Sequence, residues 1–96
     1  MQIIEASVLK QRMESEKLNL IDVRQPEEHA EFNIGGILLP LGNIMSMQID
    51  EIEDLRHEEI ICYCRSGQRS MQAAMMLETM GFTNVKNLAG GMLGWQ

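Results

Sequence analysis

A thiol that opens a short polar loop is the first feature of this sequence that suggests chemistry. Residues 64–70 read Cys-Arg-Ser-Gly-Gln-Arg-Ser, and they stand between the apolar run 60–63 and a helical pattern that begins at Met71. A cysteine at this place lies among backbone N–H groups at the positive end of a helix. We therefore predict that the helix end and the two arginines lower the pKa of Cys64, which makes it a nucleophile.

The other loop residues supply the groups that an anionic substrate needs. Glycine permits backbone angles closed to other residues, so the N–H groups of the loop can converge on the sulfur as an anion-binding nest. We expect Cys64 to attack a sulfur or another electrophile carried by an anion and to form a covalent intermediate. With thiosulfate, sulfite leaves and a persulfide remains. The expected donor-binding residues are Arg65, Ser66, Gly67, Gln68 and Arg69, and Ser70 is expected to cap the helix from Met71.

The second cysteine is expected to belong to the core. Cys62 precedes Cys64 by two residues, which is not the spacing of a redox Cys-x-x-Cys pair. Alternate strand residues lie about 6.6 Å apart, near the upper limit that a disulfide spans. We therefore predict free thiols in a reducing compartment. The histidines and cysteines are too dispersed for a zinc pattern, and we expect neither a metal nor a cofactor.

Alternating strands and helices must position this loop. Such alternation predicts a parallel sheet with helices on both faces and right-handed crossovers. Ligands bind beyond the carboxyl ends of such strands, where both Cys64 and Arg24 fall. The predicted elements are an apolar start at 3–4, a helix at 7–16 capped by Ser7, a strand at 18–23, a helix at 25–32, a strand at 37–39, a helix at 44–55 capped by Asn43, a strand at 60–63, a helix at 71–80 stopped by Gly81, a strand within 82–88 and a final turn with a short helix.

Composition limits the classes of partner. The 96 residues carry 8 basic and 14 acidic side chains, and this net charge of -6 disfavours nucleic acid and anionic membrane surfaces. No apolar run approaches the roughly 20 residues of a membrane helix, and the start of the chain lacks the features of a signal peptide. We therefore expect one soluble cytoplasmic domain over residues 1–96.

Three segments resemble the motifs of the rhodanese-type sulfurtransferases. Residues 64–70 look like the active loop of that family, Asp22-Val23-Arg24 followed by Glu27-Glu28 resembles its first motif, and residues 90–95 resemble its C-terminal motif. The resemblance implies a single rhodanese domain of the α/β class, with a central five-stranded parallel sheet and helices on both faces. It also implies that Cys64 carries the persulfide.

The resemblance assigns further roles by position. The aspartate and arginine of the first motif are usually structural in the family, which implies a supporting role for Asp22 and Arg24. The C-terminal Trp95 either packs near the active-site side or plugs the last turn. Residues 33–37 read Asn-Ile-Gly-Gly-Ile where the family often has His-Ile-Pro-Gly-Ala, a departure that concerns the pocket wall more than the thiol.

Two other functions stay open beside small-molecule sulfur transfer. Cysteine phosphatases of the same fold have five residues between the cysteine and the arginine, whereas four separate Cys64 from Arg69, so loop length favours sulfur. A persulfide carrier would use the same thiol but pass sulfur between proteins, and the acidic stretch 50–54 would then offer a partner surface, although ordinary solvation explains it better. The expected partners are a small anionic sulfur donor and a thiol, protein thiol or cyanide acceptor, and the sequence does not predict the oligomeric state.

Overall fold

A five-stranded parallel sheet forms the centre of the computed structural model, which describes residues 1–95. The strand order is β1-β5-β4-β2-β3, and every pairing is parallel. All four residues of the middle strand β4 are buried, as expected for a parallel strand covered on both faces. The predicted fold class is therefore confirmed. The strands are β1 (Gln2–Ile4), β2 (Leu20–Asp22), β3 (Ile37–Leu38), β4 (Ile60–Tyr63) and β5 (Val85–Leu88).

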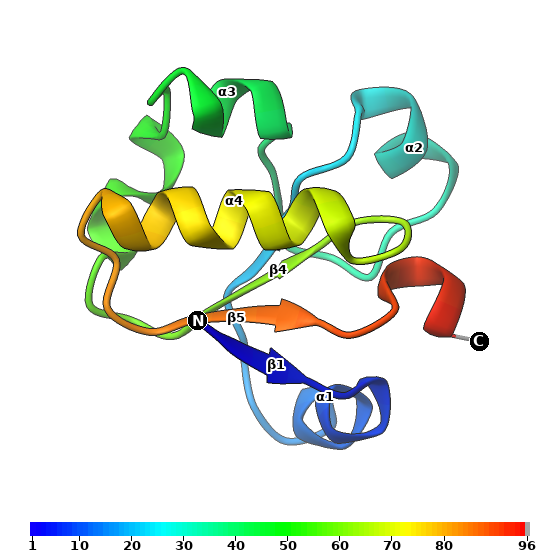
Figure 1. Ribbon diagram of the computed structural model, residues 1–96. Coiled ribbons are helices and arrows are strands. Elements are labelled where there is room, and N and C mark those ends of the chain that lie inside the picture. The colour runs from blue at the N-terminus through cyan, green and yellow to red at the C-terminus, as the bar shows by residue number, and fades with distance from the viewer. Residues whose placement is uncertain (96) are drawn as a thin grey trace.

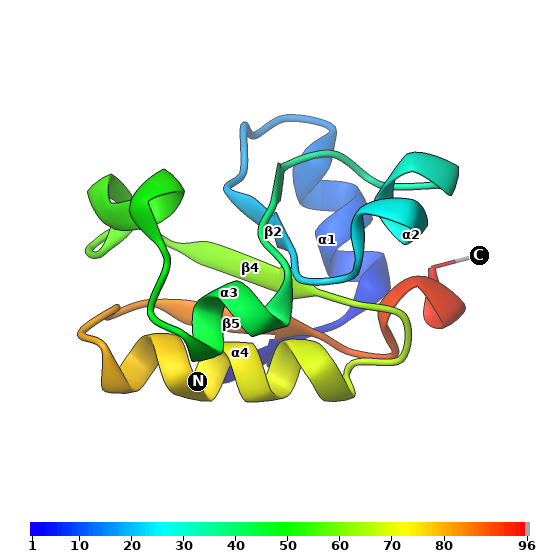
Figure 2. The ribbon, with the colours of Figure 1, turned by 90° about the horizontal axis from the view of Figure 1, so that it is seen from above.

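Helices cover both faces of the sheet. Figures 1 and 2 show α1 on one face of the sheet and α4 on the other, with α3 beside α4. Figure 1 also shows α2, the start of α4 and the last turn of the chain at the carboxyl ends of the strands. None of the helices within residues 1–95 is long and apolar enough to cross a membrane. The helices are α1 (Ala6–Met13), α2 (Pro26–Glu31), α3 (Leu41–Met45) and α4 (Gln68–Thr79), with 3₁₀ turns η1 (Asp50–Leu55) and η2 (Gly91–Gly94).

The core consists of two clusters, one on each face of the sheet. Successive residues of a strand point to opposite faces. Accordingly, Cys62 and Cys64 belong to the cluster under α3, η1 and α4, whereas Ile61 and Tyr63 belong to the cluster under α1 and η2. The sheet thus aims the Cys64 side chain toward the N-terminal end of α4.

Glycines set both ends of α4. Gly67 has a φ of 101° and Gly81 a φ of 100°, a region that favours glycine. At the C-terminal end, the Gly81 N–H donates to the Glu78 carbonyl at 3.0 Å and the Phe82 N–H donates to the Leu77 carbonyl at 3.0 Å. These two bonds form a Schellman motif, so the predicted stop at Gly81 is confirmed.

The predicted start of this helix is wrong by one turn. Gly67 is the N-cap, and its carbonyl accepts the first helical bond from the Met71 N–H at 3.1 Å. The left-handed turn at Gly67 lets the helix begin at Gln68. Ser70 therefore lies inside the first turn and is not the cap, which leaves its hydroxyl free for the loop.

The predicted helix at 44–55 is also wrong. It divides into α3 and η1, because Met47 adopts a φ of 62° that an α-helix does not allow. The carbonyl of Pro40 accepts from the Asn43 N–H at 2.9 Å, so α3 begins at Leu41 and Asn43 is an interior residue instead of a cap.

The first helix differs at both ends. The Glu5 carbonyl accepts from the Leu9 N–H at 3.0 Å, so α1 begins at Ala6 and Ser7 is not its cap. The helix ends at Met13 instead of residue 16. Hydroxyl residues at a helix start are a statistical signal for the cap, and here the backbone turn precedes the serine by one position.

Candidate active site

The sulfur of Cys64 lies at the base of a ring of hydrogen-bond donors. Its Sγ receives the N–H of Gly67 at 3.1 Å and the N–H of Ser70 at 3.3 Å, and the Ser70 hydroxyl lies 3.4 Å away. These donors belong to the loop and to the first turn of α4, where helix N–H groups have no partner within the helix. The side chain of Cys64 is fully buried. The loop therefore has the geometry of an anion site centred on the sulfur.

The pKa of Cys64 is lowered, and hydrogen bonds from the loop and the helix end are the cause, as the sequence predicted. Burial is the strongest influence on this pKa and opposes ionisation, and the hydrogen bonds from Ser70, Gly67 and Ser66 together outweigh it. The thiolate is thus favoured at the sulfur by local donors. Arginine charge, which was predicted to act beside the helix end, is not among the largest causes of the lowered pKa.

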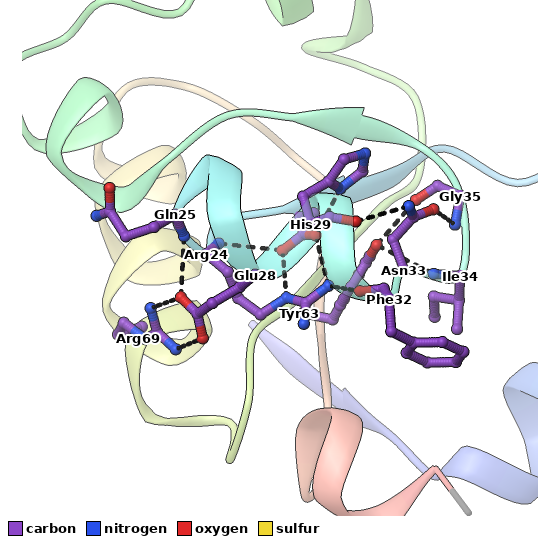
Figure 3. A network of polar contacts seen from close by, with 11 residues as sticks. Arg24, Gln25, Glu28, His29, Phe32, Asn33, Ile34, Gly35, Tyr63 and Arg69 are labelled. Carbon is purple, nitrogen blue, oxygen red and sulfur yellow. Dashed lines mark hydrogen bonds and ion pairs between the residues drawn. The ribbon is translucent and has the colours of Figure 1, made fainter.

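Arg69 is bound to a carboxylate of α2. Its two terminal nitrogens lie 2.8 and 2.9 Å from the oxygens of Glu28, a bidentate pair that Figure 3 shows between α4 and α2. The hydrogen bonds from Arg69 lower the pKa of Glu28 to about 2. The positive charge of Arg69 is therefore balanced in this structure. Arg65 is exposed and takes part in none of the ion pairs found within residues 1–95, while Ser66 and Gln68 are exposed on the loop.

Asp22 and Arg24 form a buried pair at the carboxyl end of β2. The Arg24 Nε and Nη2 atoms lie 2.9 Å from the two Asp22 oxygens, and Nη2 donates to the Phe32 carbonyl at 2.5 Å. His29 Nδ1 lies 2.8 Å from Asp22 Oδ2. Burial acts most strongly on the pKa of Asp22, but the bonds from Arg24 and His29 hold it below its ordinary value. The pair thus fastens α2 to the sheet, a position that suits the supporting role predicted for it.

Tyr63 extends the same network to the turn before β3. Its hydroxyl donates to the Gly35 carbonyl at 3.0 Å and accepts from the Ile34 N–H at 3.4 Å. The Arg24 guanidinium lies 5.6 Å from the centre of the Tyr63 ring. Sequence reasoning missed this residue as part of the site framework. A tyrosine in an apolar strand could have indicated this role, because a buried hydroxyl needs a hydrogen-bond partner.

Asn87 is the second residue that sequence reasoning missed. It lies on β5, is 2% exposed, and donates from Nδ2 to the Gly67 carbonyl at 3.1 Å. The Ser70 hydroxyl donates to its Oδ1. The signal in the sequence was weak, because Lys86 is also polar in this strand, although a buried amide must find hydrogen-bond partners.

The turn η2 holds the loop from the opposite side. The N–H of Met92 donates to the Cys64 carbonyl at 2.9 Å, and that of Leu93 donates to the Arg65 carbonyl at 2.9 Å. This approach needs a glycine at position 91, because a Cβ there would lie 2.4 Å from the Cys64 carbonyl oxygen. Trp95 packs against the α1 cluster, with the Lys10 ammonium 4.9 Å from its ring. This placement agrees with the second of the two roles predicted for Trp95, a hydrophobic plug for the last turn.

A cavity of about 300 Å³ borders the loop at Arg65. Phe32 and Leu93 are both more than half exposed at its rim. Arg24 and Glu28 contribute charges that are already paired, which leaves Arg65 as the cation able to meet a ligand there. The cavity is lined by Arg24, Glu28, Glu31, Phe32, Arg65, Met92 and Leu93.

The other thiol, Cys62, differs from Cys64 in the direction of its pKa shift. Cys62 is fully buried in the core under α4, and burial raises its pKa to about 12. It is a free cysteine, as is Cys64. Of the two thiols, only Cys64 has hydrogen-bond donors around its sulfur that lower its pKa.

The chain is similar in sequence and in structure to known proteins. The model of the family described as "Rhodanese-like domain" matches residues 5–96. A "Sulfurtransferase" of Allochromatium vinosum is 36% identical over 94 residues, covering 96% of this chain and 85% of the relative. The "Putative sulfur carrier protein YrkF" of Bacillus subtilis is also 36% identical over 94 residues, but the chain spans only 49% of it. The crystal structure of a rhodanese-like domain protein from Staphylococcus aureus superposes with a TM-score of 0.86 and 28% identity, covering 100% of this chain and 92% of the other.

Proposed function

This chain belongs to the rhodanese-like domain family, and from that membership we propose that it transfers sulfur through a persulfide on Cys64. At the level of the family, relatives named as sulfurtransferases and as a sulfur carrier support sulfur transfer. The observation that carries the proposal is the ring of donors around Sγ, because Gly67 and Ser70 favour the thiolate at this one sulfur. A thiolate is the form of cysteine that attacks another sulfur.

The proposed reaction has two displacement steps. The Cys64 thiolate attacks the outer sulfur of a donor such as thiosulfate, a new S–S bond forms, and the S–S bond of the donor breaks as sulfite leaves with the electron pair. A thiolate or cyanide acceptor then attacks the outer sulfur of the persulfide. The Cys64–sulfur bond breaks, its electron pair returns to Sγ, and the thiolate is ready for another cycle.

The loop and its supports have separate proposed roles. The N–H groups of Gly67 and Ser70, which lie 3.1 and 3.3 Å from Sγ, balance negative charge in the thiolate and in the persulfide. Arg65 lines the cavity and would meet the anionic part of a donor. The same donor-binding role is proposed for Ser66, Gln68 and Arg69, which follow it in the loop. Asp22 and Arg24 support α2 and the cavity wall, since both are bound to each other and buried.

Intact mass after treatment with thiosulfate tests the proposal. We expect a gain of one sulfur atom that maps to Cys64, is removed by a thiol reductant, and is absent in Cys64→Ser. Cys62→Ala is the matched control and should gain sulfur like the unaltered protein, because Cys62 is buried and its pKa is raised to about 12. Absence of the adduct with thiosulfate and with organic persulfide donors would contradict the proposal.

A persulfide carrier is the second candidate function. Two exposed apolar side chains, Phe32 and Leu93, stand at the rim of the cavity beside the loop and would suit a protein acceptor. Loading Cys64 with labelled sulfur and offering cyanide, a small thiol or a thiol protein separates the two functions. Fast delivery to the protein with negligible turnover of small molecules favours the carrier, and the reverse favours the enzyme.

The proposed chemistry also bears on where the protein works. Both cysteines are free thiols, and Cys64 must be reduced before it can attack a donor. A reducing compartment such as the cytoplasm supplies that condition. Fractionation of cells, followed by trapping of free thiols on the protein, tests this assignment.

A further inference from the structure

A buried amide contacts the loop from a strand outside the motifs that indicate function. Asn87 is paired in register with Cys62 on the neighbouring strand β4, and its side chain is 2% exposed on the side of the sheet that α4 covers. Val85, two residues earlier on the same face, belongs to the apolar core. A polar residue at such a position costs stability unless its hydrogen bonds are satisfied. The loop supplies a hydrogen-bond partner to both the nitrogen and the oxygen of the Asn87 amide.

The two contacts fix how the amide is turned. The Gly67 carbonyl can only accept, so the nitrogen of Asn87 must face it, and Nδ2 lies 3.1 Å from that oxygen. The Asn87 Oδ1 then faces Ser70 and accepts from its hydroxyl. One side chain therefore holds two loop residues, Gly67 and Ser70, and these are the residues whose N–H groups contact the Cys64 sulfur.

We propose that Asn87 is a positioning residue for the nucleophile, which holds Gly67 and Ser70 so that their hydrogen-bond donors converge on the Cys64 sulfur. This inference deepens the proposed function and rests on it for its biological meaning. The Ser70 hydroxyl has one proton and three neighbours, namely Asn87 Oδ1, the Gly67 carbonyl at 3.2 Å and the Cys64 sulfur at 3.4 Å. A fixed Ser70 oxygen at this junction keeps the first turn of α4 against the sulfur.

Charge does not explain the effect of Asn87, because the amide is neutral. The titratable groups around Cys64 are Cys62 on β4, Arg65 in the loop and Arg69 on α4, whose charge is paired with Glu28 of α2. The contact from η2 comes from the backbone of Met92 and carries no charge. Removal of the Asn87 amide therefore changes the placement of donors and leaves the charges around the sulfur as they are.

The pH dependence of Cys64 alkylation by iodoacetamide, measured without a sulfur donor, tests the proposal. Cys62 does not react in the relevant range, because burial raises its pKa to about 12, and peptide mapping confirms the site of reaction. Asn87→Leu keeps the approximate size and removes both hydrogen bonds. We expect the pH midpoint of alkylation to rise by about one unit, with a loss of several fold in rate at neutral pH.

Val85→Ala is the matched structural control. It weakens the same face of the same strand without touching the loop, so we expect a lower melting temperature and an unchanged midpoint. A midpoint that stays or falls in Asn87→Leu, or an equal rise in Val85→Ala, would overturn the proposal. If Asn87→Leu does not fold, Asn87→Ala is read by the same criteria.

A double-mutant cycle with Ser70→Ala supplies a second readout. Because Asn87 acts in part through the Ser70 hydroxyl, Asn87→Leu should shift the midpoint less in a Ser70→Ala background than in the unaltered protein. Full additivity would overturn the link through Ser70. Neither measurement needs a persulfide to form, so a failure of Cys64 to take up sulfur contradicts the proposed function and leaves the test of Asn87 intact.

Discussion

At the scale of single residues, the electrostatics of the site depend on which arginine is free. Arg69 is held by Glu28 in a bidentate pair, whereas Arg65 is exposed at the cavity. The positive charge offered to an anionic donor is therefore smaller than the two arginines of the loop suggest. This balance is open to a direct test, because Glu28 and Glu31 line the same cavity and only Glu28 contacts Arg69.

We predict that Glu28→Gln accelerates the reaction of Cys64 with thiosulfate by roughly three- to tenfold at low ionic strength, because it frees the Arg69 charge. Glu31→Gln removes the same charge from the same cavity and should have a smaller effect. Stopped-flow measurement of persulfide formation at two salt concentrations distinguishes them. Equal acceleration in both variants would show that release of Arg69 is not the cause.

Residue identities predicted the donors around the Cys64 sulfur better than the partners of the loop side chains. The sequence pointed to Cys64 as a nucleophile, and the structure places its sulfur among the loop N–H groups as expected. The partner of Arg69 is 41 residues away in the chain, and the partner of Ser70 is 17 residues away. Such contacts depend on how α2 and β5 are brought to the loop, so a local motif does not reveal them.

At the scale of elements, the loop is held between α4 and η2. Gly91 allows η2 to approach because a Cβ at this position would lie 2.4 Å from the Cys64 carbonyl oxygen and 2.6 Å from that of Arg65. Both neighbours are backbone atoms, which cannot move without moving the loop. Gly91 also has a φ of 54°, which a side chain rarely adopts.

We therefore predict that Gly91→Ala lowers the free energy of unfolding by about 2 to 4 kcal/mol and slows persulfide formation at least tenfold. Gly94→Ala is the control from the same turn, since a Cβ there meets only the Ala89 carbonyl, at 3.6 Å. Chemical denaturation and the rate of sulfur loading provide the two measurements. Similar behaviour of both variants would contradict the packing argument.

The sequence predicted four of the five strands and gave residues 3–4 only as an apolar start, where the structure has β1, and it did not predict every helix boundary. Apolar runs such as 60–63 are strong signals because a buried parallel strand is apolar throughout. The division at Met47 left no such signal, since a methionine rarely adopts the positive φ of this turn, in which the Met47 N–H donates to the Ile44 carbonyl and the Gln48 N–H to the Asn43 carbonyl. The start of α4 was missed because serine is ordinarily a better N-cap than glycine, whereas the left-handed φ of Gly67 allows the earlier turn.

At the scale of the whole molecule, one carboxylate joins three parts of the chain. Glu59, just before β4, lies 2.9 Å from Arg12 of α1 and 2.7 Å from the Lys86 ammonium of β5. Hydrogen bonds from Arg12 are the largest cause that lowers the pKa of Glu59 to about 2. A carboxylate with a lowered pKa stabilises the fold above its ordinary pKa of 4.5, and this stabilisation is lost as the pH falls toward about 2.

We predict that Glu59→Gln lowers the free energy of unfolding at neutral pH by about 1 to 2 kcal/mol. This value allows for solvent screening, which weakens ion pairs that are partly exposed. The loss of stability between pH 4.5 and about 2 should also become less steep. Urea denaturation as a function of pH measures both effects. Glu53→Gln, which removes a more exposed pair with Arg56, should change neither value much, and a parent-like slope in Glu59→Gln would contradict the prediction.

The assignment of residues 1–96 to one domain stays a prediction at this scale, whereas the five-stranded parallel sheet is confirmed. Alternation of strands and helices was enough to predict the class of the sheet. The strand order was beyond the sequence, because the pairing of β1 with β5 joins distant parts of the chain.

This strand order bears on how the protein folds. β4, α4 and β5 follow one another in the chain and are neighbours in space, so residues 60–88 form a compact unit with little loop-closure entropy to overcome. The pairing of β1 with β5 must close a far longer loop. Amide hydrogen exchange during refolding should therefore protect β4 and β5 before β1, so that the N–H groups of Gly67 and Ser70 gather around the Cys64 sulfur before the edge strand β1 has joined the sheet.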